Sequence, residues 1–99
     1  RSMIAYEAAR LLMARSRWAE ALPHLRGVPQ RLRGIGARDE ADRIESMLAE
    51  ALLHSGSADE AVGMLRALLD RLPGDAVLRE PVTALLAAAD KARTDPPPS

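Results

Sequence analysis

The chain has 99 residues with 14 basic and 14 acidic side chains, so its formal charge at pH 7 is zero and no global charge draws it toward nucleic acid or membranes. It has no cysteine, which excludes disulfides, zinc–thiolate sites and cysteine nucleophiles. No apolar run reaches the roughly 18 residues of a membrane-spanning helix and no signal peptide is recognisable, so we expect a cytoplasmic protein without membrane contact. The preference for Arg over Lys, with abundant Ala and Leu, is typical of a bacterial protein from a GC-rich genome.

Strong helix formers dominate the composition, and no alternation of β-branched residues indicates a strand. We therefore predict an all-α domain over residues 1–94 with five helical segments. The first segment, residues 3–14, carries an apolar stripe at helical spacing. The second, residues 16–33, contains Pro23 and Pro29, which each remove a backbone hydrogen bond. We predict a kink near Pro29, or two short helices that meet there.

The third and fourth segments have clear ends. Residues 39–55 begin with a cluster of acidic side chains, which the positive end of the helix dipole favours. Gly56 ends this segment. Ser57 and Glu60 then have the spacing of a capping box, in which each side chain accepts a hydrogen bond from the other residue's backbone N–H. Pro73 and the glycine after it end the fourth segment.

The fifth segment, residues 75–93, contains Pro81, which should bend the helix or mark its true start. Residues 95–99 are rich in proline, and we expect them to form a disordered tail. The predicted segments are joined by short connections, and short connections make neighbouring helices antiparallel. We therefore predict two helical hairpins, residues 3–35 and 39–73, and a final helix that covers the exposed side of the second hairpin.

Residues 14–22 and 54–62 repeat one pattern, in which a turn-prone linker is followed by Glu-Ala and an apolar residue. Trp18 lies three positions before Ala21, and the second copy has Ala61 and a turn glycine in the same register. On these residues, positions 3 to 75 resemble the tetratricopeptide repeat family. The interval from Ala21 to Ala61 is longer than the ~34 residues usual in that family, and it is similar to the longer repeats of large bacterial transcriptional regulators.

The resemblance implies a short right-handed α-solenoid of stacked hairpins with a C-terminal capping helix. It also implies a non-catalytic scaffold for protein–protein interaction, because in this family the first helix of each hairpin lines a concave groove that holds a peptide. Matching the register assigns the groove to Tyr6, Arg10, Met13, Arg43, Met47, Glu50 and His54. Arg10 and Arg43 would bind acidic groups of the partner. The carboxylate clamp of some relatives is absent, so the resemblance implies no chaperone partner.

No motif predicts catalysis, a cofactor or a bound metal. The two histidines, His24 and His54, have no metal-ligand partner at helical spacing, and acidic clusters at helix starts are explained by the dipole. Four arginines cluster in one stretch: Arg26, Arg31, Arg33 and Arg38. We interpret them as a solvated face, since aromatic residues for base stacking are nearly absent, which disfavours nucleic acid. Trp18 has two interpretations, a core residue or an exposed anchor at an interface.

The charge is divided unevenly along the chain. Residues 1–38 hold eight Arg and two Glu, a net +6, whereas residues 39–99 carry a net −6. The two halves could be solvated faces, or they could dock head to tail within one chain or between copies. Two hairpins are also fewer than the three or more repeats that usually stand alone. The alternative function is therefore a homodimerisation module, or a fragment of a longer repeat array in a bacterial regulator.

Overall fold

The computed structural model describes the backbone of residues 2–94 and the side chains of residues 7–94. Within that range the chain forms helices joined by turns and loops, with no strand. There are six helices: α1 Ser2–Ala14, α2 Trp18–Leu25, α3 Val28–Gly34, α4 Arg38–His54, α5 Ala58–Arg71 and α6 Arg79–Thr94. The predicted all-α class is thus confirmed. The predicted tail and the side chain of Tyr6 lie outside the described residues.

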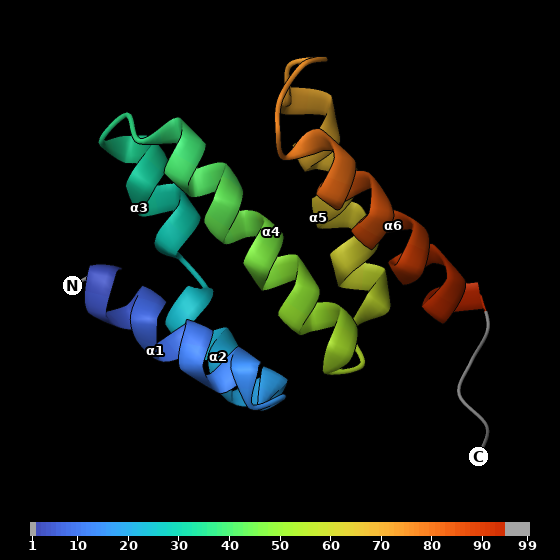
Figure 1. Ribbon diagram of the computed structural model, residues 1–99, viewed down its shortest axis with the longest axis horizontal. Helices are drawn as coiled ribbons and strands as arrows, with labels where there is room; N and C mark the ends of the chain where they lie inside the picture. The colour runs from blue at the N-terminus through green and yellow to red at the C-terminus, as the bar shows by residue number, and fades with distance from the viewer. Residues whose placement is uncertain (1, 95–99) are drawn as a thin grey trace.

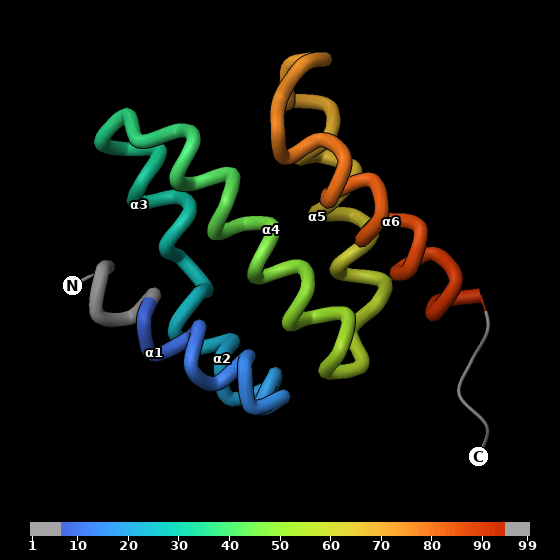
Figure 2. Tube along the Cα trace, viewed as in Figure 1, coloured from blue at the N-terminus to red at the C-terminus, as the bar shows by residue number. Residues whose placement is uncertain are grey.

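The helices form two layers in a slab of 43 × 31 × 18 Å. Figure 1 shows α1, α4 and α6 on the near side, with α2 and α5 behind them. Each helix of the series α1, α2, α4, α5 and α6 packs on the next, and α3 also packs on α4. The course of the chain in Figure 2 shows α4 in the middle of this arrangement. The right-handed superhelical stacking implied by the resemblance stays a prediction.

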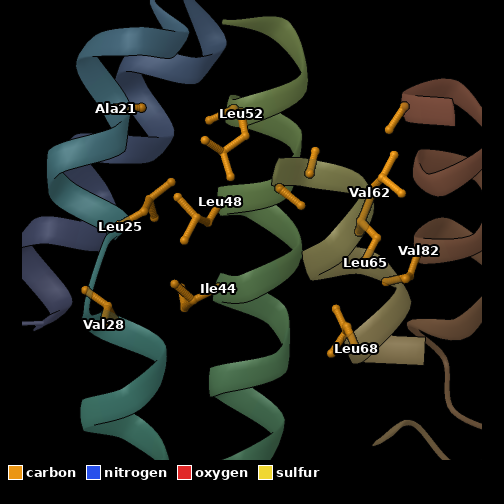
Figure 3. Packing of buried hydrophobic residues seen from close by; sticks show 14 of the residues in the cluster. Ala21, Leu25, Val28, Ile44, Leu48, Leu52, Val62, Leu65, Leu68 and Val82 are labelled. Atoms are coloured by element: carbon orange, nitrogen blue, oxygen red, sulfur yellow. The ribbon is translucent and has the colours of Figure 1, made fainter. Parts of the chain in front are cut away.

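The hydrophobic core follows α4 on both sides. Figure 3 shows Leu25 of α2 facing Leu48 of α4, and Leu65 of α5 facing Val82 of α6. Leu25, Leu65 and Val82 are fully buried, and Leu48 is 5% exposed. Burying one such side chain contributes roughly 1.5–3 kcal/mol, so this layer of leucine and valine holds the helices together.

The second predicted segment is broken into two helices, which is one of the two alternatives predicted from its prolines. α2 ends at Leu25, and Gly27, with φ of 82°, redirects the chain before α3 begins. Pro29 lies in the first turn of α3. Backbone N–H groups in a first turn have no acceptor within the helix, so the N–H that proline lacks costs no hydrogen bond. This break turns the five predicted segments into six helices.

Three tight turns share one hydrogen-bond pattern and follow each other at equal intervals along the sequence. In each turn a backbone amide donates to a leucine carbonyl at 2.8 Å: Arg17 N to Leu12 O, Ala37 N to Leu32 O, and Ser57 N to Leu52 O. The residue before each of these amides has a positive φ: 58° at Ser16, 83° at Gly36 and 93° at Gly56. Four positions after each amide comes a fully buried alanine preceded by glutamate: Ala21, Ala41 and Ala61.

We call this recurring pattern the turn unit. Its backbone amide is that of Arg17 in the first copy, Ala37 in the second and Ser57 in the third. The repeat predicted from the sequence compared only the first and third copies, so it spans two turn units. The middle copy is hard to recognise in the sequence because the helix before it, α3, is short and contains a proline. The first copy departs from the pattern, since Ser16 occupies the left-handed conformation that glycine adopts in the other two.

Two predicted details are wrong. Ser57 makes no side-chain capping bond; its backbone N–H donates to Leu52 O, and the Glu60 carboxylate pairs with Arg26 instead. The last helix begins at Arg79 rather than residue 75, which places Pro81 in its first turn. Pro81 therefore marks the real start of the helix and does not bend it.

Candidate functional site

The predicted groove residues of α4 lie on one face of that helix. Arg43, Met47, Glu50 and His54 follow one another at helical spacing, and the fully buried core residues of α4 lie on other faces. Arg43 and His54 are exposed, whereas Met47 and Glu50 are half-buried. We call these four residues the α4 stripe. The most central helix of the molecule thus leaves one face open.

The predicted groove residues of α1 lie on a neighbouring helix of the same layer (Figure 1). Met13 is half-buried and packs against the core, while Arg10 is exposed and pairs with Glu7 at 3.7 Å. α1 packs chiefly on α2. The side chain of Tyr6, the third predicted residue of this group, is outside the described range.

Arg43 forms an exposed ion pair with Glu40 of the same helix, at 3.5 Å. Both side chains are about half exposed, so the pair is screened by water and contributes little to stability. The guanidinium can therefore exchange this partner for a ligand carboxylate at small cost.

Trp18 and His54 form an aromatic stack at the C-terminal end of the α4 stripe. Their ring centroids are 4.3 Å apart and their planes differ by 24°. Trp18 is half-buried and packs against the core. It is therefore partly a core residue and partly accessible at the surface, the two roles that the sequence left open. A recess of about 360 Å³ beside the stack is lined by Arg17, Glu20 and Ser55 among others. The indole and imidazole thus form an aromatic wall next to a solvent-open hollow.

The contact between Trp18 and His54 could not be predicted from the sequence, although both residues were singled out there. Trp18 begins α2 and His54 ends α4, with α3 between these helices along the chain. No periodicity joins positions in different helices, and the pairing follows only from the way α2 packs on α4.

A network of charged side chains ties α3, α4 and α5 together at the opposite end of α4. Arg33 Nη2 donates to Asp42 Oδ1 at 2.9 Å and also to Glu45 Oε1. Arg71 Nη2 donates to both oxygens of Glu45, at 2.7 and 2.8 Å. Although partial burial opposes the effect, the bonds to Glu45 and Asp42 raise the pKa of Arg33 above its ordinary value. We call these four residues the arginine network.

A second ion pair joins the α2–α3 connection to α5. Arg26 Nη1 donates to Glu60 Oε2 at 2.9 Å and Arg26 Nη2 donates to Glu60 Oε1 at 3.4 Å. The hydrogen bond from Arg26 lowers the pKa of Glu60 below its ordinary value, and the same bond raises the pKa of Arg26. Interpreting the four clustered arginines as a solvated face is thus wrong for Arg33, which is half-buried between helices, whereas Arg26 is exposed although it pairs with Glu60. It holds for Arg31 and Arg38, which are exposed.

Across residues 7–94, no group of three or more His, Cys, Asp or Glu side chains could hold a metal ion. None of the helices is long and apolar enough, over the described part of the chain, to cross a membrane. No protein-family model, no curated protein and no solved structure matches this chain. Its function is therefore inferred from the geometry of the described residues.

Proposed function

We propose that this chain is a non-catalytic scaffold that binds a segment of another protein along the α4 stripe, with the Trp18–His54 stack at one end of the bound segment. The observation that carries the proposal is the open face of α4. This helix packs against α2, α3, α5 and α6, yet Arg43, Met47, Glu50 and His54 remain wholly or partly accessible. The resemblance to tetratricopeptide repeats supports the same assignment, since there the corresponding helix lines the groove.

The resolved pKa shifts have a structural cause. They fall on Arg26, Arg33 and Glu60, and each comes from an ion pair between helices. Catalytic groups are usually perturbed inside a cleft where a substrate can reach them. Here the perturbed groups hold the helices in place.

The chemistry of the stripe defines the partner. From Arg43 to His54 the stripe extends for roughly 16 Å at about 1.5 Å per residue, which matches about five residues of extended chain. Arg43 favours a carboxylate at one end of the segment. Met47 offers a flexible apolar contact in the middle, and the stack offers an aromatic surface at the other end. We therefore propose a short partner segment that combines an acidic residue with apolar ones.

The affinity should be modest. The stripe is narrow and its central residues are already half-buried by the fold, so little further apolar area is covered on binding. We expect dissociation constants on the order of micromolar.

The proposal is tested by selecting random heptapeptides on the folded chain and titrating the selected peptides into it. Trp18 is the only tryptophan, and its stacking on His54 makes its fluorescence a reporter of binding at the stripe. We expect the selected peptides to be acidic and apolar. Arg43→Ala should weaken their binding about tenfold, as loss of one charge-assisted contact of roughly 1.4 kcal/mol requires.

Arg66→Ala is the matched control for this test. Arg66 lies on α5 and pairs with Asp90 at 3.5 Å, and its side chain is 58% exposed against 56% for Arg43. The proposal requires that this control leave peptide affinity unchanged. Equal affinities for the Arg43→Ala and Arg66→Ala variants would contradict it.

A further inference from the structure

One end of the molecule carries two poles of opposite charge. The turn between α3 and α4 and the connection between α5 and α6 both lie at this end, at the top of Figure 1. We call the exposed residues Arg31, Ile35 and Arg38 the basic pole, because they flank and include the α3–α4 turn. The acidic pole, around the α5–α6 connection, consists of Asp70, Asp75, Val77 and Glu80, which are also exposed.

The charges of both poles are available to a partner. Arg31 and Arg38 form no ion pair within residues 7–94, and neither do Asp70, Asp75 and Glu80. Other exposed charges, such as Arg17 and Glu20, are by contrast paired with each other at 2.6 Å. Five of the unpaired charges of residues 7–94 therefore lie on two neighbouring segments of one end, the arginines on one segment and the acids on the other. The unpaired acid Asp39 lies beside Arg38, and other unpaired charges, such as Arg15 and Lys91, lie elsewhere.

Each pole also presents an aliphatic side chain to solvent. Ile35 is 79% exposed and Val77 is 92% exposed. Elsewhere in residues 7–94, only Leu11 is a comparably exposed large hydrophobic residue. An aliphatic side chain at the tip of a turn and surrounded by charges has the composition of an interface, in which an apolar centre is bordered by a polar rim.

The region between the poles has hydrogen-bond donors to spare. A recess of about 500 Å³ is lined by Arg33, Arg38, Asp42 and Arg71. Arg33 and Arg71 each use only Nη2 to bond the carboxylates of the arginine network. Their Nε and Nη1 donors make no hydrogen bond within the described residues, so the recess can bind a carboxylate from outside.

We infer that this end is a self-complementary interface through which two copies of the chain dimerise, with the basic pole of each copy against the acidic pole of the other. Because both poles belong to one end, a two-fold axis through that end pairs them twice. Ile35 of one copy then lies beside Val77 of the other. The opposite signs of the unpaired side chains that define the two poles favour this pairing, whereas Arg26 and Arg33 of the basic half already pair with acids of their own chain.

The inference differs from the proposed peptide site in its location. The α4 stripe lies on one layer of the slab, whereas the poles lie at the end of the molecule. Failure of one proposal therefore leaves the other standing. In particular, Arg38→Glu should leave the affinity for peptides measured with Trp18 unchanged.

The mass of the purified chain in solution, measured by sedimentation over a wide range of concentration, tests the inference. We expect a dimer at about 0.02 M salt that dissociates at about 0.5 M, since exposed charge pairs are screened. A protein that stays monomeric at every concentration overturns the inference. That outcome is also the one expected if the basic pole binds an acidic segment of another protein.

Charge reversal gives the decisive comparison. Arg38→Glu and Asp75→Arg each place like charges opposite one another at both contacts, so each variant alone should raise the dimer dissociation constant at least tenfold. A mixture of the two variants pairs opposite charges again at both contacts of the mixed dimer, the two substituted side chains at one contact and the native Asp75 and Arg38 at the other, and it should dimerise more tightly than either variant alone. The double variant in one chain pairs opposite charges at both contacts, and it should recover the dimer.

Both variants change exposed residues outside any ion pair of the described chain, so the fold should be retained. Arg15→Glu is the matched control, because Arg15 is also exposed and outside any ion pair of residues 7–94 but lies in the α1–α2 turn, at the bottom of Figure 1. It should leave the dimer intact. A dimer that survives Arg38→Glu, or a double variant that does not recover it, contradicts the inference.

Discussion

The bond between Arg26 and Glu60 joins the α2–α3 connection to α5. Glu60 could have capped its own helix, but its carboxylate accepts two hydrogen bonds from Arg26, and α5 has no side-chain capping bond. A charged donor forms a stronger hydrogen bond than a neutral amide does. The local capping rule is therefore overridden by a partner 34 residues away.

This contact makes stability depend on pH. The pKa of Glu60 is lowered in the folded chain from its ordinary value of 4.5, so the contact stabilises the fold at pH values above that value. The contribution is lost as the pH falls through the lower folded value. Glu60→Gln should therefore unfold at a lower temperature than the wild type near neutral pH, and the difference should shrink below about pH 4. Thermal unfolding followed by circular dichroism checks this, and a difference that grows in acid would contradict it.

At the scale of the helices, the turn unit explains where the chain reverses. Gly36 and Gly56 adopt the left-handed conformation without steric cost, whereas Ser16 adopts it at φ of 58° with a Cβ atom present. The first turn is therefore the strained copy of the three. The strained residue, Ser16, lies in the turn that connects α1 to the rest of the molecule.

Ser16→Gly should relieve that strain. We expect the free energy of unfolding to rise by about 0.5–1 kcal/mol, measured by urea denaturation. Gly56→Ser is the reciprocal variant, and it should lower the free energy of unfolding by about 1 kcal/mol. A Cβ at position 56 meets no atom within 4 Å, so its effect comes from the backbone conformation alone. A destabilised Ser16→Gly protein would show that the turn is not strained.

At the scale of the whole molecule, the arginine network holds three helices in one arrangement. Glu45 of α4 is 13% exposed and accepts hydrogen bonds from Arg33 of α3 and Arg71 of α5. Removing this mostly buried carboxylate leaves Arg71 without a counter-charge and leaves Arg33 with Asp42 alone. The network therefore affects the position of the short helix α3, in which only Val28 and Pro29 are buried.

Glu45→Ala should lower the free energy of unfolding by about 2 kcal/mol, measured by urea denaturation. Glu50→Ala is the control on the same helix, because Glu50 is half-buried and makes no ion pair among the described residues. The control should change stability by less than about 0.5 kcal/mol. Equal losses for the two variants would mean that the network does not stabilise the fold.

Much of the architecture was predictable from local patterns. The helical class, the break in residues 16–33 and the ends of α4 and α5 follow from periodicity and from Pro and Gly, because these signals act over a few neighbouring residues. That Arg43, Met47, Glu50 and His54 share one face of α4 was also predictable, since positions four and seven apart on one helix share a face whatever that helix packs against. The sequence by itself determined the helical class and the approximate bounds of most helices, whereas which face of α4 stays open depends on the helices that pack against it.

The tertiary structure alone decided which side chains meet across helices. The Trp18–His54 stack and the Arg33–Glu45–Arg71 bonds join residues in different helices, as does the Arg26–Glu60 pair. No local rule selects these partners, because an exposed arginine could pair with any of several carboxylates at a similar interaction energy. The packing of α2 and α3 on α4, and of α5 on the other side of α4, makes the selection. The same packing brings the α3–α4 turn and the α5–α6 connection, which are far apart in the sequence, to one end of the molecule.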